Sequence, residues 1–339
     1  MTVMTLPGWP LEESPYHPGE IAMQERAGVR ARAERLGRGG IRDFMPDQHR
    51  ELFTKLPYLL VGSVDRAGQP HASILVGPSG FIGSPDSGTL TIGARPDAAD
   101  PLASNLAVGA PLGLLGIELD TRRRNRMNGV VAAQDGHGFA VEVRQSFGNC
   151  PQYIQARAPF FVLDATAKTA AMQREEPILS DRATALLHDA DTFFIATATP
   201  PERRKSVADG VDISHRGGRP GFVRVTEESG ARVLTVPDFR GNNQFNTLGN
   251  IALEPRTGLL IVDFTTGDLL SLIAEGTVVW DGEELRAFAG AQRLLKLRVT
   301  GGLLRPGAIP LRWSQPHQAP QLAATGAWDE VRAPSGTSG

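Results

Sequence analysis

Residues 239–243 read Phe-Arg-Gly-Asn-Asn and have the side-chain types of an anion-binding loop. A strand is predicted before them and a helix after them, so the unpaired backbone N–H groups at the start of that helix would face the loop. Gly241 lets the backbone approach an anion closely, and Arg240 adds a guanidinium with several N–H donors. The same residue types are equally typical of a turn that caps a helix, and that alternative stays open.

A second polar group lies at the end of an earlier predicted strand, where Ser214, His215 and Arg216 follow one another. They supply a hydroxyl, an imidazole that can stack or hydrogen-bond, and a second guanidinium. The simpler interpretations are a histidine with satisfied hydrogen bonds at the mouth of a barrel, and a solvated arginine at a strand end. The candidate binding residues of the C-terminal half are Ser214, His215, Arg216, Phe239, Arg240, Asn242 and Asn243.

Motifs for other kinds of chemistry are missing from the sequence. It has no Gly-x-Ser-x-Gly turn for acyl transfer, and its histidines lack the spacing typical of a metal site. The single cysteine, Cys150, has no basic cluster beside it in the sequence, which favours packing over a nucleophilic role. Residues 122–126, Arg-Arg-Arg-Asn-Arg, could reach a cofactor phosphate, a substrate anion or the phosphate of a reduced nicotinamide, but such a run is more often solvated. We therefore predict no metal site and assign no catalytic side chain.

Composition narrows the class of protein. The chain has 339 residues, of which 41% are hydrophobic and 21% charged, and a net charge of −2. This length suits two domains, and the near-neutral charge gives no electrostatic reason to expect nucleic acid or an anionic membrane as a partner. No run of about 18 apolar residues occurs, and the N-terminus lacks the features of a secretory signal. A single cysteine suits a reducing compartment, so we expect a cytoplasmic protein.

We expect short strands and a few helices to position these residues. In the N-terminal half we predict helices at 20–36 (a surface helix), 46–53 and 100–108, and strands at 58–64, 71–77, 89–92, 114–119, 129–133 and 139–144. In the C-terminal half we predict strands at 192–198, 211–216, 221–225, 233–236, 259–264 and 269–280, and a helix at 244–252. Many short strands with turn signals predict antiparallel barrels.

The two halves repeat one strand-and-helix phrase at a constant spacing. Asn105 precedes Leu114 in the first half and Asn250 precedes Leu259 in the second, an offset of 145 residues in both cases (105 to 250 and 114 to 259). A constant offset of this length is typical of a duplicated domain. We therefore predict an α+β, mainly β protein of two tandem split β-barrels that pack as an intrachain pseudo-dimer, either monomeric or further paired as a homodimer.

The predicted domain boundaries follow from this repeat. They are an N-terminal helical extension at 1–50, a first split barrel at 51–158, a connector with room for a helix at 159–185, a second split barrel at 186–315, and a loose C-terminal tail at 316–339.

The C-terminal half resembles the FMN-binding split barrels related to pyridoxamine 5′-phosphate oxidase. Four segments carry the resemblance in order and spacing: 212–217 (Asp-Ile-Ser-His-Arg-Gly), 220–223 (Pro-Gly-Phe-Val), 234–243 (Leu-Thr-Val-Pro-Asp-Phe-Arg-Gly-Asn-Asn) and 246–250 (Asn-Thr-Leu-Gly-Asn). In that family FMN lies between two barrels, and the strand-loop-helix element holds its phosphate. The resemblance implies that Ser214, Arg216, Arg240, Asn242 and Asn243 line the phosphate and ribityl chain of FMN.

The N-terminal half departs from this pattern in the equivalent loop, residues 93–100. That loop carries two acids, Asp97 and Asp100, and lacks Gly-Asn-Asn. Because negative side chains oppose an anion, we predict a poor phosphate site there despite Arg95.

Other parts of the family pattern are kept in the N-terminal half alone. Arg126 and Asn128 belong to an Arg-x-Asn-Gly strand start. Asn149 and Gln152 lie in a segment that resembles the one by which related proteins complete the flavin site from the neighbouring barrel. We therefore expect one FMN site per chain, with its phosphate loop from the second half and these four residues closing it from the first.

The resemblance implies a flavoprotein, most simply an FMN-dependent oxidoreductase that transfers a hydride or electrons to or from a small-molecule substrate or reductant. Residues 310–317 do not match the Arg-x-His substrate motif of the true oxidases, so pyridoxamine phosphate is not the expected substrate. An electron-transfer partner protein is conceivable. The alternatives are a non-catalytic flavin-binding or storage protein, and a relative that binds the deazaflavin F420 or haem.

Overall fold

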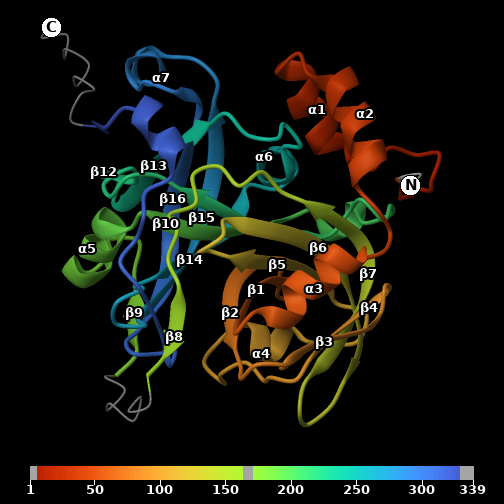
Figure 1. Ribbon diagram of the computed structural model, residues 1–339. Coiled ribbons are helices and arrows are strands. Elements are labelled where there is room, and N and C mark those ends of the chain that lie inside the picture. The colour runs from red at the N-terminus through yellow and green to blue at the C-terminus, as the bar shows by residue number, and fades with distance from the viewer. Residues whose placement is uncertain (1–5, 163–170, 329–339) are drawn as a thin grey trace, which may run out of the picture.

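The computed structural model describes residues 6–162 and 171–328 and places them in two large antiparallel sheets with short helices around them (Figure 1). The N-terminal half forms the first sheet, in the order β2-β1-β5-β6-β7-β4-β3. Its strands are β1 Tyr58–Val64, β2 Pro70–Val76, β3 Ile82–Asp86, β4 Thr89–Ile92, β5 Pro111–Glu118, β6 Arg123–Gln134 and β7 Phe139–Gly148.

The C-terminal half forms the second sheet, in the order β11-β10-β14-β15-β16-β13-β12, which matches the first order position by position. Its strands are β10 Thr192–Ala198, β11 Val211–Gly217, β12 Arg224–Glu228, β13 Ala231–Phe239, β14 Arg256–Val262, β15 Leu269–Val279 and β16 Ala291–Arg305, with β9 Gln173–Glu175 paired to β16. A small sheet pairs β8 Pro159–Phe161 with β17 Leu311–Trp313.

The helices of the described residues are short. They are α1 Pro18–Arg26, α2 Arg30–Gly40, α3 Asp47–Lys55, α4 Leu102–Asn105, α5 Asp181–Asp189, α6 Asn246–Leu253 and α7 Glu283–Ala287, with 3-10 turns η1 Pro201–Arg203 and η2 Pro320–Ala324. None of them is long and apolar enough to cross a membrane.

The prediction of a mainly β protein with few helices is confirmed. Equivalent side chains also make equivalent contacts in the two sheets. The amide of Asn105 donates to Ser63 Oγ at 3.0 Å, and the amide of Asn250 donates to Thr197 Oγ1 at 3.1 Å. Backbone pairing does not close either sheet into a barrel, because the end strands of each order do not pair with each other in the described part of the chain.

A shared apolar cluster joins the two sheets. It includes Leu60 and Leu115 from the first sheet and Phe194 and Leu260 from the second, all buried. Glycine allows the backbones to approach closely at equivalent points of this interface. A Cβ at Gly113 would lie 2.6 Å from the carbonyl oxygen of Val211, and a Cβ at Gly258 would lie 2.4 Å from that of Pro70. Each sheet therefore approaches the backbone of the other at an equivalent glycine.

The helix predicted at 20–36 is two helices. Gly28 separates α1 from α2 with a φ of +67°, a left-handed conformation that stops a helix. The expectation of a surface helix is also wrong for α1, since Glu20, Met23 and Gln24 are buried and α1 packs on α6. In Figure 1 these two helices lie beside α6, at one end of the second sheet.

Several strand predictions were displaced or incomplete. Strand β12 begins at Arg224, near the end of the predicted 221–225 segment, and continues to Glu228. Strands β6 and β7 extend well beyond their predicted ends, and β3 and β16 were not predicted. The helix at 100–108 is reduced to the single turn α4.

The connector and tail are more ordered than predicted. The described part of the connector contains β8, β9 and the start of α5, while residues 163–170 lie outside the described residues. The predicted loose tail is wrong for residues 316–328, because Trp328 packs on Phe288 and its Nε1 donates to the carbonyl oxygen of Phe222 at 2.8 Å. Residues 329–339 lie outside the described residues.

Candidate functional site

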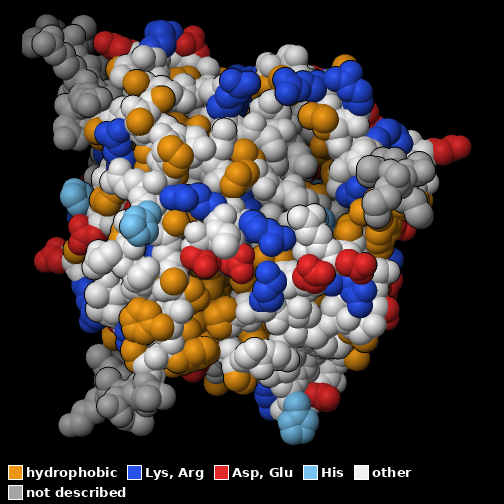
Figure 2. Space-filling model, viewed as in Figure 1, with side chains coloured by type: hydrophobic (Ala, Val, Ile, Leu, Met, Phe, Trp, Pro, Cys, Tyr) orange, Lys and Arg blue, Asp and Glu red, His pale blue; other side chains and the backbone are white. Residues whose placement is uncertain are grey.

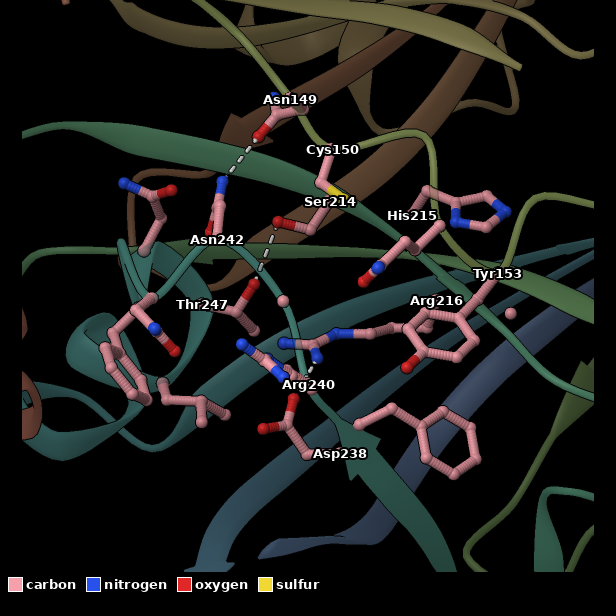
Figure 3. A pocket seen from close by; sticks show the side chains of 18 of the residues that line it. Asn149, Cys150, Tyr153, Ser214, His215, Arg216, Asp238, Arg240, Asn242 and Thr247 are labelled. Atoms are coloured by element: carbon pink, nitrogen blue, oxygen red, sulfur yellow. Dashed lines mark hydrogen bonds and ion pairs between the residues drawn. The ribbon is translucent and has the colours of Figure 1, made fainter. Parts of the chain in front are cut away.

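A cavity lies where the second sheet, helix α6 and the 149–153 segment of the first half meet (Figure 3). The space inside it, including its open mouth, is about 880 Å³. In the same view as Figure 1, Figure 2 shows a hollow in the upper half of the molecule, with Lys and Arg side chains near its rim. Walls from both halves surround this cavity.

The loop predicted to bind an anion forms one end of the cavity. It follows β13 directly, and Arg240 at its start is exposed, with no carboxylate partner among the described residues. The side chain of Asn242 accepts from the backbone N–H of Gln244 at 3.1 Å and donates to Asn149 Oδ1 at 3.2 Å (Figure 3). The last contact joins the loop to the first half of the chain.

Helix α6 begins at this loop with its first N–H groups uncapped. Its N-cap residue, Phe245, has a left-handed backbone (φ 66°) and makes no side-chain cap. That conformation costs a bulky residue about 1–2 kcal/mol. Packing holds it in place, since the Arg293 guanidinium lies 4.9 Å from the centroid of the ring and the ring stacks with Trp280. The first turn of the helix, which includes Thr247, therefore presents backbone donors to the cavity.

A hydrogen-bonded cluster ties the first half to the wall beneath the loop. Arg126, only 4% exposed, donates from Nη1 to Asp212 Oδ1 at 3.0 Å and from Nη2 to Ser214 Oγ. Asn128 Nδ2 also donates to Asp212 Oδ1, at 2.8 Å. Thr247 Oγ1 lies 2.9 Å from Ser214 Oγ. The charge of Arg126 is therefore compensated by protein, and Asn128 positions Asp212 rather than lining the cavity.

Arg216 lines the cavity but its charge is also compensated. It pairs with Asp238, whose other oxygen accepts from Arg293 Nε at 2.8 Å. One buried carboxylate therefore holds two guanidinium groups. Neither Asp238 nor Arg293 was among the predicted site residues, the latter because β16 was not predicted.

The remaining wall consists of aromatic and basic side chains. The rings of Tyr153 and Phe239 stack with centroids 4.9 Å apart. Arg124 donates from Nε to the carbonyl oxygen of Cys150 at 2.8 Å, and burial together with the charge of Arg126 lowers its pKa to about 10.

His215 lies close to Arg124 and is buried in the same wall. Burial, followed by the charges of Arg124 and Arg216, lowers the pKa of His215 well below its ordinary value. Its Nε2 has no hydrogen-bond partner among the described residues.

The cavity brings together ten of the eleven predicted site residues and leaves out Asn128. The ten are Ser214, His215, Arg216, Phe239, Arg240, Asn242, Asn243, Arg126, Asn149 and Gln152. The basic run at 122–126 is divided: Arg122 lies in the turn before β6, whereas Arg124 and Arg126, within β6, line the cavity. Their period-two spacing was a signal that a strand interpretation would have used. Cys150 also lines the cavity. No cluster of three or more metal-ligating side chains occurs in the described residues.

Comparisons with known proteins give distant structural likenesses only. No protein-family model matches the chain, and no curated protein matches it. A crystal structure of HupZ from Group A Streptococcus matches with a TM-score of 0.26 and 13% identity, over 31% of this chain and 93% of that one. A "putative pyridoxamine 5′-phosphate oxidase" from Lactobacillus delbrueckii matches with a TM-score of 0.28 and 12% identity, over 38% of this chain and 93% of that one. At these TM-scores the likenesses carry no argument about function.

Proposed function

We propose that the cavity is an FMN site and that the protein is an FMN-dependent oxidoreductase acting on a small molecule. The observation that carries the proposal is the uncapped start of α6 beside Arg240, at the end of a cavity with walls from both halves. Backbone N–H groups at a helix N-terminus and an uncompensated guanidinium suit a phosphate. Arg240, Asn242, Asn243 and Thr247 would hold that group.

Buried polar atoms without partners support the fit of a polar cofactor. Within the described residues these atoms include Asn149 Nδ2 and Arg216 Nε, both in the wall of the cavity. Leaving such atoms unpaired costs about 1–3 kcal/mol each, so a ligand that bonds to them gains affinity. They come from both halves, as a site shared between them requires.

The chemistry of bound FMN is hydride or electron transfer, which needs no protein nucleophile. The chain's own residues bind, orient and exclude water. The stacked rings of Tyr153 and Phe239 exclude water from one side. Asp238 offsets the charges of Arg216 and Arg293, which would otherwise repel each other. No side chain is assigned a proton-transfer role.

We also propose that the two halves arose by duplication and act as an intrachain pseudo-dimer with one site. The matching strand orders and the equivalent contacts of Asn105 and Asn250 support this proposal. The origin of the cavity residues supports it further, since the loop comes from the second half and Asn149 and Gln152 come from the first.

The absorption spectrum of the purified protein tests the cofactor. We expect an FMN spectrum and close to one FMN per chain after release and quantification. A ratio near two contradicts the single site, whereas a deazaflavin spectrum, a haem Soret band or a protein with no affinity for added FMN contradicts the FMN assignment. Anaerobic reduction by NADPH or NADH followed by substrate-dependent reoxidation distinguishes an oxidoreductase from a storage protein, which would show no such cycle.

A further inference from the structure

Arg124 and His215 form a second polar group in the cavity, apart from the phosphate loop. Neighbouring residues of a strand point to opposite faces, so His215 on β11 faces away from Ser214 and Arg216. It faces the first half of the chain, where Arg124 is the charged group with the largest effect on the pKa of His215. Figure 3 shows His215 on the side of Cys150 and Tyr153, away from Thr247.

The Arg124 guanidinium keeps an uncompensated charge. Its Nε is used by the carbonyl oxygen of Cys150, and it has no carboxylate partner within the described residues. The other basic side chains of this wall differ, since Arg126 pairs with Asp212 and Arg216 pairs with Asp238. Burial lowers the pKa of Arg124 only to about 10, so it is a cation at neutral pH.

His215 adds an unused hydrogen-bonding nitrogen beside this cation. The side chain is 6% exposed, and the edge contact of its ring with Phe194, at 5.9 Å between centroids, fixes its orientation. The lowered pKa keeps the imidazole neutral, and in the Nε2–H tautomer it donates a hydrogen bond without adding charge. One guanidinium and one neutral donor together suit a group with a single negative charge.

We propose that Arg124 and His215 bind the carboxylate of the small-molecule substrate. Two N–H groups of a guanidinium match the two oxygens of a carboxylate, and the imidazole supplies a further donor. A phosphate dianion belongs at the loop instead, where Arg240 and the start of α6 provide more positive potential. The inference rests on the proposed function, because it names the substrate class of an oxidoreductase whose cofactor phosphate occupies the loop.

Benzoate and its neutral analogue benzamide test this subsite by calorimetric titration of the purified protein. We expect benzoate to bind saturably, and Arg124→Gln to weaken it about ten- to hundredfold, as loss of a charge-assisted contact does. Benzamide should bind weakly to both proteins. Arg240→Gln is the matched control, because it should weaken FMN binding and leave the benzoate affinity within about twofold.

His215→Phe keeps the ring shape and provides a second variant should Arg124→Gln fold poorly. It should weaken benzoate several-fold while retaining the cofactor. Failure of wild-type protein to bind benzoate, or equal affinity of wild type and both variants, overturns the subsite. Protein that never binds FMN contradicts the proposed function instead, and the benzoate titration of that same protein still reports on Arg124.

Discussion

The two halves differ at one pair of positions 145 residues apart: Asp100, two residues before α4, and Phe245, immediately before α6. Asp100 is 5% exposed, and its Oδ1 accepts from Ser73 Oγ and, at 3.0 Å, from the backbone N–H of Leu102. Its Oδ2 accepts at 2.7 Å from Arg305, which belongs to the second sheet. The first half therefore supplies its own anion.

The second half has a similar frame, but there the carboxylate that pairs with the crossing arginine is Asp212 on β11, and loop 239–243 carries no acid. Ser214 occupies the same register position as Ser73, and Arg126 crosses from the opposite sheet as Arg305 does. Phe245 brings no carboxylate to the start of α6. The acids of loop 93–100 were predicted to oppose an anion, but Asp100 replaces one. The difference shows how one half can be sealed as structure while the other stays open to a ligand.

Removal of the internal anion should give the largest effect. Asp100→Ala leaves Arg305 buried without its partner, and breaking such a pair costs about 3–5 kcal/mol. Urea unfolding measures this loss. Added inorganic phosphate should restore part of it by binding in place of the carboxylate. Asp97→Ala is the control, because Asp97 is exposed and only caps the N–H of Ala99. A loss below about 1 kcal/mol would remove the basis of the comparison.

The open site should depend on its free arginine. Arg240→Ala should weaken FMN by about 1.5–3 kcal/mol, or ten- to hundredfold, because a charge-assisted contact is lost. Arg95→Ala, in the equivalent loop of the first half, should leave FMN affinity unchanged, since its Nη1 reaches only the carbonyl oxygen of Gly136. Fluorescence titration of apoprotein measures both. Equal losses in the two variants would mean that both loops bind phosphate.

Acid should act on the first half through His49. Burial, with the charges of Arg42 and Arg123, lowers the pKa of His49 from 6.5 to about 4. Because the unfolded chain binds this proton at higher pH than the folded chain, the free energy of unfolding should fall as pH drops from about 7 to about 4, by at most about 3 kcal/mol from this group. His49→Gln should flatten that part of the profile in urea unfolding. An unchanged slope contradicts the assignment.

The hydrogen bond between Asn242 and Asn149, which joins the two halves, should contribute least to FMN affinity. Asn242→Ala removes the contact with Asn149 Oδ1, and a partly exposed neutral hydrogen bond is worth about 0.5–1.5 kcal/mol. FMN affinity should fall by less than tenfold, with global stability unchanged. Asn149→Ala should have a similar effect, and the double variant should lose less than the sum if the two act through this contact. Strict additivity would show that each contacts the ligand separately.

Local sequence patterns were enough to predict strands that are continuous apolar runs. Strands β1 and β10 were predicted with their observed bounds, because apolar runs such as Phe193 to Ile195 lie between clear turns. Ten of the site residues were also placed on one cavity, since loop and strand motifs survive in the sequence. The break at Gly28 was missed, because the polar helix pattern continues across it.

Long-range contacts could not be predicted from local patterns. Asp100 and Arg305 are 205 residues apart, and nothing near either residue in the sequence indicates the pairing. Strand β16 was missed because Lys296 and Arg298 lie among its apolar residues and Gly301 interrupts them. Without β16, neither Arg293 nor its carboxylate partner could be assigned to the cavity.

Because the apolar cluster joins the two sheets within one chain, diluting the protein should not take the cavity apart. Both walls of the cavity belong to one polypeptide, so its assembly is a unimolecular event. A site shared by two separate subunits would come apart below their dissociation constant, and every substitution would appear on both of its sides. Here a substitution alters one wall only. Natural variation can therefore change the contacts with one end of a ligand while the contacts with the other end stay the same.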